Sequence, residues 1–424
     1  MNSQLNVSIS KCIFFLIAIF SCMMLVKIDV FSAFFIVQVM GIGILSIRKS
    51  GKLHFSTDRR VNFVFLSFLI STVACQFSTT WLSYRKAAIA EFILLIPVYF
   101  TYAYLEYATQ DNCELLSILK KGVQCACVIQ LVWCLLQFVL YRLWTIDLNQ
   151  IVFVNILHTV ESASHYKAGA FLPSGMCWHA AFMAPVAAIS YMIFDNWVIK
   201  GLAVLDAIVC NNATALIVIC ICVFLDFIFQ LRRCNETKKI RAQSLAAVLV
   251  LIVLIPYVMK TGIWKTVLEK VVYIIQRITG SAFDGGSADA HIRYYTDYPK
   301  VLQRSSLIQI LFGYGLGCSG YPISVIKGQY DALKSWAVES DVIDILVSRG
   351  VFGFFIFYGW IIRIAARGIK TDYRYFVLAV ALAAGGITYN IQFDWVILIE
   401  LMLWLSLKRN VNFFQNITKK TTTD

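Results

Sequence analysis

Long apolar segments recur along this chain, and their length constrains the fold more than any other feature. A helix needs about 20 mostly apolar residues to cross the hydrocarbon core of a bilayer. Of the 424 residues, 59% are hydrophobic and only 14% are charged, whereas soluble domains are about 45–50% apolar and about 25% charged. The sequence therefore predicts an all-α polytopic integral membrane protein, a single transmembrane domain over residues 1–424. We expect about twelve spans, at 11–28, 30–48, 61–77, 87–107, 122–142, 171–194, 197–210, 213–230, 243–260, 340–365, 374–390 and 393–407.

Basic residues are concentrated in alternate loops. The segments "RKSGKLHFSTDRR" (48–60) and "RRCNETKKIR" (232–241) hold five Lys/Arg each, while "NIQFDW" (390–395) holds none. This is the asymmetry expected when basic loops stay in the cytoplasm. It predicts cytoplasmic N- and C-termini. Most of the net charge of +13 then sets topology, so no nucleic-acid partner is expected.

Two segments predicted to face outward are long, 143–170 and 260–339. The second is far longer than an ordinary connection, and long loops usually carry function. Its sequence predicts an amphipathic helix at 262–280, a second helix at 291–313 bent near Pro299, and then a glycine-rich turn.

The 260–339 segment holds nine Lys/Arg against six Asp/Glu, although an outer loop should be depleted of basic residues. An excess of cations indicates an anionic ligand such as phosphate. Arg293 and Arg304 are the main candidates, with His291, Lys300 and Lys334 nearby. The alternatives are solvated loop charges or contacts with lipid headgroups.

Acidic residues cluster where the tenth predicted span begins, in "ESDVIDILVSRGVFG" (339–353). Glu339 is either an acid stabilised by the helix dipole or a general base at the membrane surface. Asp341, Asp344 and Ser348 share one helical face, which we expect to point into the protein or a water-filled vestibule. Arg349 is expected to pair with one of these acids or to extend outward to the interface.

Two motifs in this region resemble the O-antigen ligase/polymerase superfamily. They are "ILFGYGLGCSG" (310–320) and Glu339-Ser340-x9-Gly350-x-x-Gly353. The ligase branch is similar but carries His where this chain has Glu339, which favours the polymerase branch (the Wzy type). Arg304-x10-Gly315 also resembles a polymerase pattern, and "KAGAFLPSG" (167–175) is a degraded match to another family motif.

The resemblance implies a GT-C-like, inverting glycosyltransferase of the bacterial inner membrane that needs neither a metal nor a cofactor. Its substrates would be glycans linked to undecaprenyl pyrophosphate, as both donor and acceptor, and a chain-length regulator would be a partner. An O-antigen ligase and a flippase or other transporter remain the alternatives. The implied residues are a base (Glu339, with His291 second), pyrophosphate ligands (Arg293, Arg304, Lys334, Lys167) and structural glycines (Gly313, Gly315, Gly317, Gly350, Gly353).

Overall fold

The computed structural model describes residues 2–28, 31–49, 53–78, 82–111, 114–163, 166–167, 170–233, 287–327 and 338–390. Most of this part of the chain is helical. Its β-structure is two short antiparallel hairpins, β1 (Lys27–Ile28) with β2 (Phe31–Ser32) and β3 (Tyr166–Lys167) with β4 (Ala170–Phe171). The helices are α1 (Asn2–Phe20), α2 (Ala33–Lys49), α3 (Arg59–Ser78), α4 (Leu82–Asp111), α5 (Glu114–Trp144), the π-helix η1 (Gln150–Ile156), the 3-10 helix η2 (Ala180–Phe182), α6 (Met183–Ile193), α7 (Trp197–Val209), α8 (Ala213–Arg233), α11 (Ser287–Arg304), α12 (Leu307–Phe312), α13 (Gly320–Lys327), α14 (Asp341–Thr371) and α15 (Tyr373–Thr388).

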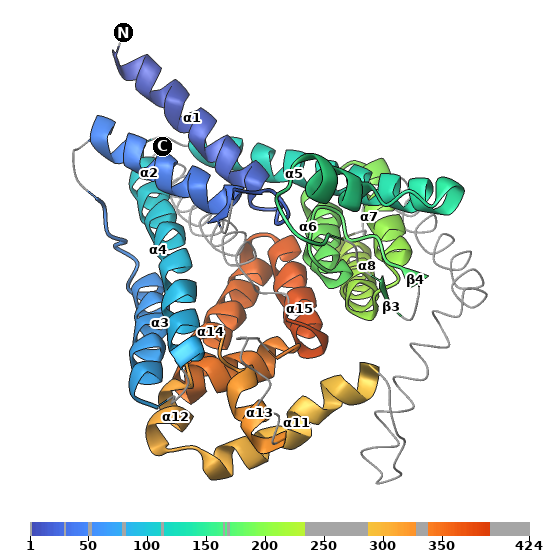
Figure 1. Cartoon of the computed structure of the whole chain (residues 1–424). Coiled ribbons are helices and arrows are strands. Elements are labelled where there is room, and N and C mark those ends of the chain that lie inside the picture. Colours follow the sequence, from blue (N-terminus) through green and yellow to red (C-terminus); the bar gives the residue numbers. More distant parts are fainter. Residues whose placement is uncertain are drawn as a thin grey trace.

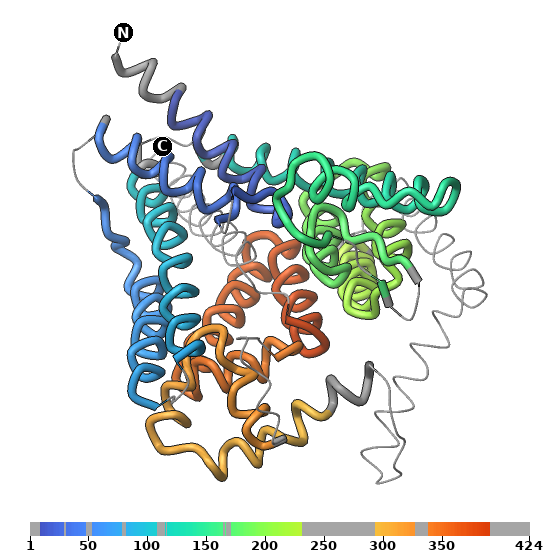
Figure 2. Tube along the Cα trace, in the orientation of Figure 1, coloured from blue at the N-terminus to red at the C-terminus, as the bar shows by residue number. Residues whose placement is uncertain are grey.

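The α14–α15 hairpin lies at the centre of the molecule (Figure 1). On one side α14 packs against α3, and on the other α15 packs against α6 and α8. Helices α1, α2 and α5 lie across one end of this arrangement, and helices α11, α12 and α13 lie at the opposite end (Figure 2). The α11–α13 segment therefore covers the end of the hairpin at which α14 begins.

Apolar side chains fill the contacts between helices and also cover much of the outer surface. Phe14, Met183 and Phe357 are among the fully buried core residues, while Phe77 and Phe355 are 85% and 70% exposed. Large apolar side chains on the outside of a long helix favour contact with lipid rather than water. Among the described residues, the helices long and apolar enough to cross a membrane are Arg59–Ser78, Leu82–Tyr107, Ser117–Trp144, Ala213–Gln230 and Asp341–Thr371, with shorter apolar helices at Ile9–Phe20, Ala33–Ile47, Ala180–Ile193 and Tyr373–Thr388.

The asparagines of "AIVCNNATA" (207–215) predict a short hairpin instead of one long helix over 197–230, and the structure confirms it. Helices α7 and α8 are separated by a turn in which Asn211 has a φ of 47°, and the Asn212 side chain accepts a hydrogen bond from the Thr214 N–H at 2.9 Å. With 13 residues, α7 is only about 20 Å long, which is short for a full span. The predicted spans at 243–260 and 393–407 and the amphipathic helix at 262–280 lie outside the described residues.

The predicted span at 171–194 is wrong in its first half, because α6 begins only at Met183. Residues 172–179 are not helical, and Gly175 has a φ of 62°. Two buried glutamines of α5 satisfy this irregular backbone: Gln137 accepts from the N–H groups of Ser174 and Gly175, and Gln130 accepts from that of Met176. Periodicity alone could not reveal that a neighbouring helix supplies these partners.

The predicted helix at 291–313 is interrupted, although not at Pro299. Helix α11 continues through Pro299 to Arg304, and α12 begins two residues after Ser305. Ser306 caps α12 through a capping box with Gln309, which satisfies N–H groups at the helix start and favours a new helix there.

Candidate functional site

The two glycine motifs predicted to be structural turns contact each other. Helix α14 is broken at Gly350, which has a φ of 68° and a ψ of −175°. A Cβ atom on Gly350 would clash with the backbone of Leu311 and would lie 2.6 Å from the Gly313 nitrogen. A Cβ atom on Gly313, whose φ is 82°, would in turn clash with the backbone at Ser348 and Arg349. We call this backbone contact the glycine interlock.

The interlock also satisfies the backbone groups that the helix break releases. Tyr314 donates its N–H to the Val347 carbonyl at 2.8 Å, and Gly315 donates to the Ser348 carbonyl at 2.9 Å. The Ser71 hydroxyl of α3 donates a further hydrogen bond to the Ser348 carbonyl. Such pairing is required when a helix within a membrane is interrupted.

The other predicted glycines allow close approaches to neighbouring helices. Gly315 (φ 110°) leaves no room for a Cβ atom beside Cys75 of α3, and Gly317 (φ 65°) faces the Glu91 side chain of α4. Gly353 leaves space for the Arg349 side chain of the preceding turn. The glycine-rich segment (residues 313–320) is thus placed against α3, α4 and α14 by four of the five predicted turn glycines, while Gly353 makes room for a side chain within α14.

The acids at the start of α14 are buried, as the sequence predicted for that face. Asp341, Asp344 and Ser348 are 1%, 4% and 1% exposed. Asp344 accepts a hydrogen bond from the Ser319 hydroxyl, which in turn accepts from the Val338 N–H at 2.8 Å. These bonds connect Asp344 of α14 to the glycine-rich segment.

Arg349 does not extend to the interface, because its side chain is 8% exposed. Its guanidinium carbon lies 4.4 Å from the centre of the Phe68 ring and 5.6 Å from that of Phe357. Its positive charge acts on Asp344. Burial of Arg349 therefore contradicts the predicted extension to the interface, and pairing with an acid is the alternative that stays a prediction.

Glu339 lies outside α14, whereas the sequence placed it at the helix start. Ser340 is the N-cap, with extended backbone angles (φ −160°, ψ 120°), and Asp341 and Asp344 occupy the first turn. All three carboxylates therefore lie within about one turn of the helix start, where the helix dipole acts.

Two tyrosines from other elements lie close to Glu339. Burial and the charge of Glu339 raise the pKa of Tyr294 of α11 to about 12. The same two causes raise the pKa of Tyr389, which follows α15. The neighbouring Tyr295 fixes α11 in place, since its hydroxyl lies 2.9 Å from the Ser340 hydroxyl and donates to the Ile387 carbonyl at 2.8 Å.

His179 is a further neighbour of this group and was missed by sequence reasoning. Its ring stacks on Tyr389 with 4.6 Å between ring centres, and its Nδ1 accepts the Ala181 N–H at 3.1 Å. A neutral ring with Nδ1 as acceptor carries its proton on Nε2. The prediction of a helix over 171–194 hid this residue, although it lies only four residues after the "KAGAFLPSG" match. We call Glu339, Tyr294, Tyr389 and His179 the Glu339 cluster.

The two predicted pyrophosphate ligands are not brought together. Arg293 and Arg304 are both exposed and both lie on α11. Eleven residues of helix separate them by about 16 Å along the axis. Arg293 directly precedes Tyr294 of the Glu339 cluster, whereas Arg304 lies beside the glycine-rich segment, because the hydroxyl of adjacent Ser305 is 2.8 Å from that of Tyr314.

The remaining predicted residues are less well placed. His291 lies in α11, one turn before Tyr294. Lys167 lies on β3, opposite Ala170 of β4. Lys334 lies outside the described residues.

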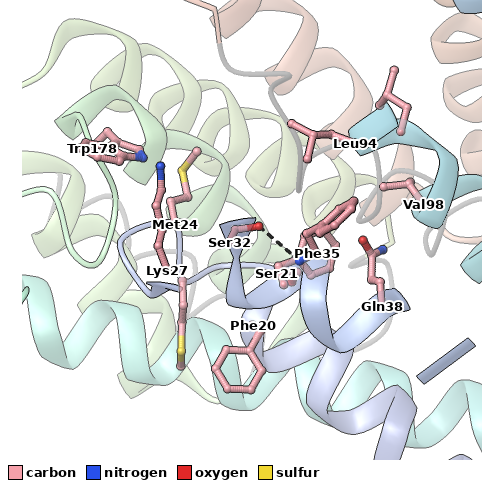
Figure 3. A pocket seen from close by; sticks show the side chains of 13 residues that line it. Phe20, Ser21, Met24, Lys27, Ser32, Phe35, Gln38, Leu94, Val98 and Trp178 are labelled. Carbon is pink, nitrogen blue, oxygen red and sulfur yellow. Dashed lines mark hydrogen bonds between the residues drawn. The ribbon is translucent and has the colours of Figure 1, made fainter. Parts of the chain in front are cut away.

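A cavity of about 110 Å³ lies between the α1–α2 connection and α4 (Figure 3). Its lining is mainly apolar, and Lys27 lies at one side with its Nζ 4.3 Å from the centre of the Trp178 ring. Small-molecule sites usually measure about 300–1,000 Å³, so this volume suits only part of a ligand. Among the described residues, no group of three or more His, Cys, Asp or Glu side chains is placed to hold a metal ion.

The fold thus defines the class of this protein as a mostly helical membrane protein with a buried polar site at one end of its central hairpin. Comparison with protein-family models finds no match, and a search of curated proteins also finds none. The resemblance to the O-antigen superfamily is consequently carried by the motif residues themselves.

Proposed function

We propose that this chain is a glycosyltransferase that polymerises oligosaccharide repeat units at the outer face of a bacterial inner membrane. The donor and the acceptor are both glycans on undecaprenyl pyrophosphate, and the product is O-antigen or a related surface polysaccharide. In this proposal the chain has about twelve spans, a GT-C-like arrangement and cytoplasmic termini, and a chain-length regulator is a protein partner. The observation that carries the proposal is the Glu339 cluster, in which the charge of a carboxylate outside its helix acts on Tyr294 and Tyr389, and His179 stacks on Tyr389.

The cluster suits the proton transfer that such a reaction needs. The Glu339 carboxylate takes the proton of an acceptor hydroxyl, whose oxygen attacks the anomeric carbon of the donor. The bond from that carbon to the pyrophosphate oxygen breaks, and the lipid pyrophosphate leaves with the electron pair. A positioned general base contributes about 10²–10⁴-fold to a rate. His179 and the phenol of Tyr294 supply donors for the sugar hydroxyls, with His291 as the second candidate base.

The arginines of α11 are suited to bind phosphate groups at two separate places. Developing negative charge on a pyrophosphate is stabilised by preorganised cations, and arginine binds phosphate oxygens through paired N–H groups. Because about 16 Å of helix separates them, Arg293 and Arg304 serve different phosphates. Arg293 acts at the Glu339 cluster, and Arg304 acts near the glycine-rich segment, with Lys167 and Lys334 as additional cations.

A transporter is the second candidate, and one observation favours it. Helix α14 is broken at Gly350 and carries the buried charges Asp341, Asp344 and Arg349. Interrupted helices with buried charges are typical of substrate sites in transporters. In α14, however, the break is occupied by backbone from the glycine-rich segment, so the released carbonyls of Val347 and Ser348 already have partners.

The first experiment is a gel profile of surface polysaccharide from a strain lacking this chain. We expect a single repeat unit on its anchor and no ladder of longer products. An anchor without any repeat, with long lipid-linked chains accumulating, would instead indicate a ligase. An unchanged ladder would argue against both the polymerase and the ligase function and would favour a transporter.

The second experiment complements that strain with Glu339→Gln. We expect the ladder to be lost while the protein reaches normal membrane levels, because the amide cannot accept the proton. Glu161→Gln is the matched control, since Glu161 is an exposed acid outside the cluster, and it should restore the ladder. A full ladder from Glu339→Gln would refute the assignment of Glu339 as the base.

Arginine variants test the leaving-group contacts. Arg293→Ala and Arg304→Ala should each shorten or abolish the ladder at normal membrane levels, whereas Gln303→Ala, an exposed change on the same helix, should not. Retention of long products by both arginine variants would exclude α11 from pyrophosphate binding.

A further inference from the structure

Helix α12 presents a bare apolar face in the middle of what the sequence predicts to be an aqueous loop. Its sequence, LIQILF, has no charge, and Leu307, Ile308 and Leu311 are 70%, 56% and 39% exposed. Its polar side chain is already engaged: the Gln309 amide donates to the Ser78 carbonyl at 3.1 Å and accepts from the Ser306 N–H at 2.8 Å. Water would therefore meet only apolar groups on this face.

The apolar face of α12 continues onto the helices beside it. Helix α12 packs against α3 and α14, and the Phe312 ring contacts the Phe352 ring of α14 with 5.9 Å between centres. Phe77 at the end of α3 and Phe355 of α14 are 85% and 70% exposed. Both helices are long and apolar enough to span a membrane, so α12 extends their outer apolar surface.

The residues that follow α12 lie well below the ends of these spans. Gly313 contacts the backbone at Ser348 and Arg349, and the Ser348 carbonyl is also bonded by Ser71. At 1.5 Å per residue, Ser71 is about 10 Å from the end of α3. Gly317 faces Glu91, about 13 Å from the start of α4. Since α3 has 20 residues, about the length needed to cross the hydrocarbon core, a bilayer spanned by α3 would enclose these contacts.

The backbone N–H groups of this segment have hydrogen-bond partners within the protein, so the segment can lie within the hydrocarbon core. Gly313 donates its N–H to the Gln309 carbonyl at 2.8 Å, and Tyr314 and Gly315 donate to carbonyls of α14. Gly313, Tyr314 and Gly315 are themselves buried in protein. Irregular backbone occurs at membrane depth only where protein surrounds it or where it lines water.

We propose that residues 307–319 form a re-entrant segment, in which α12 contacts the acyl chains of lipids and the glycine-rich segment dips into the bilayer between α3, α4 and α14. The 260–339 region is then divided by a membrane-inserted element rather than being one aqueous loop. Arg304, three residues before α12, sits where the chain enters the bilayer, at the level of lipid phosphates. This inference depends on the membrane class of the protein and not on the proposed enzyme activity.

Fluorescence quenching in liposomes tests the segment directly. Ile308→Cys and, as a second site, Leu307→Cys would carry an environment-sensitive NBD label in vesicles of phosphatidylethanolamine and phosphatidylglycerol. Gln303→Cys, on the exposed end of α11, is the matched control, and the protein without an added cysteine gives the background. Quenchers are nitroxide-labelled phosphatidylcholine in the bilayer and iodide in the water.

We expect the labels at 307 and 308 to be quenched by the nitroxide lipid at least several-fold more than the label at 303, with iodide giving the opposite order. Iodide quenching at 307 and 308 equal to that at 303 would overturn the proposal and return α12 to the aqueous loop. Protection from both quenchers would also overturn it, because the apolar face would then be covered by protein, such as a second copy of this chain.

Discussion

Replacing Gly350 with alanine tests the glycine interlock at its tightest point. Gly350 sits at a φ of 68° and a ψ of −175° inside α14, a region of backbone space that is essentially restricted to glycine. An alanine Cβ would also collide with the backbone of Leu311 and Gly313. Because backbone atoms rather than flexible side chains stand in the way, α12 or the second half of α14 must move.

The cost follows from these two effects. Holding a non-glycine residue in such a conformation costs about 1–3 kcal/mol, and overpacking costs about 1–3 kcal/mol more. Reduced entropy of the unfolded chain returns about 0.4–1 kcal/mol. The expected net loss of stability is therefore roughly 1–5 kcal/mol, a large part of the about 5–15 kcal/mol that stabilises a typical protein.

Gly359 of the same helix provides a matched control, since a Cβ atom there would meet nothing within 4 Å. Gly359→Ala should leave stability unchanged or raise it by up to about 1 kcal/mol through helix propensity. Thermal unfolding of both variants in the same detergent compares them. Gly350→Ala should melt several degrees below the parent protein, and Gly359→Ala should not.

A combined variant sharpens the test. Gly313→Ala breaks the same backbone contact from the other side, so Gly313→Ala with Gly350→Ala should cost clearly less than the sum of the two single changes. A Gly350→Ala protein as stable as Gly359→Ala would refute the steric argument. Full additivity would show that the two glycines act in separate places.

Two further predictions concern charge. Asp344→Ala should destabilise the protein by about 3–5 kcal/mol, because it removes a buried carboxylate that accepts from the Ser319 hydroxyl and interacts with the charge of Arg349; denaturation in detergent measures this, and a loss below about 1 kcal/mol would contradict the assigned interaction. Tyr294 should ionise near pH 12, seen as the difference in phenolate absorbance between the parent and Tyr294→Phe. Since its pKa is raised above the unfolded value of about 10, stability should fall as pH rises from about 10 towards 12, and Glu339→Gln should lower this pKa only in part, because burial is the larger cause.

The sequence predicted the membrane class and several local features of the site. Apolar segments of the required length gave helices at most described spans, and the Asn211–Asn212 break was a turn between two helices, as expected. The face formed by Asp341, Asp344 and Ser348 was correctly predicted to point into the protein. These features depend on residue type and spacing within one segment, and the periodicity of apolar residues along the sequence shows both.

Other features could not be predicted because they depend on contacts between distant segments. The backbone of 172–179 is irregular because Gln130 and Gln137 of α5 satisfy it, and that irregular segment presents His179 to the Glu339 cluster. Tyr294 and Tyr389 come from α11 and the end of α15, whose meeting no local pattern indicates. Arg293 and Arg304 were predicted from charge to bind the same pyrophosphate, but they lie far apart along one helix.

The sequence by itself determined that the chain belongs in a bilayer, since hydrophobicity and segment length act independently of partners. It also selected the glycines, because their motif spacing was visible without a structure. Only the tertiary structure decided what those glycines do: Gly313 and Gly350 are required because two backbones from separate elements occupy the space of a side chain. Steric exclusion between segments about 35 residues apart is a property of packing, and no propensity within either segment specifies it.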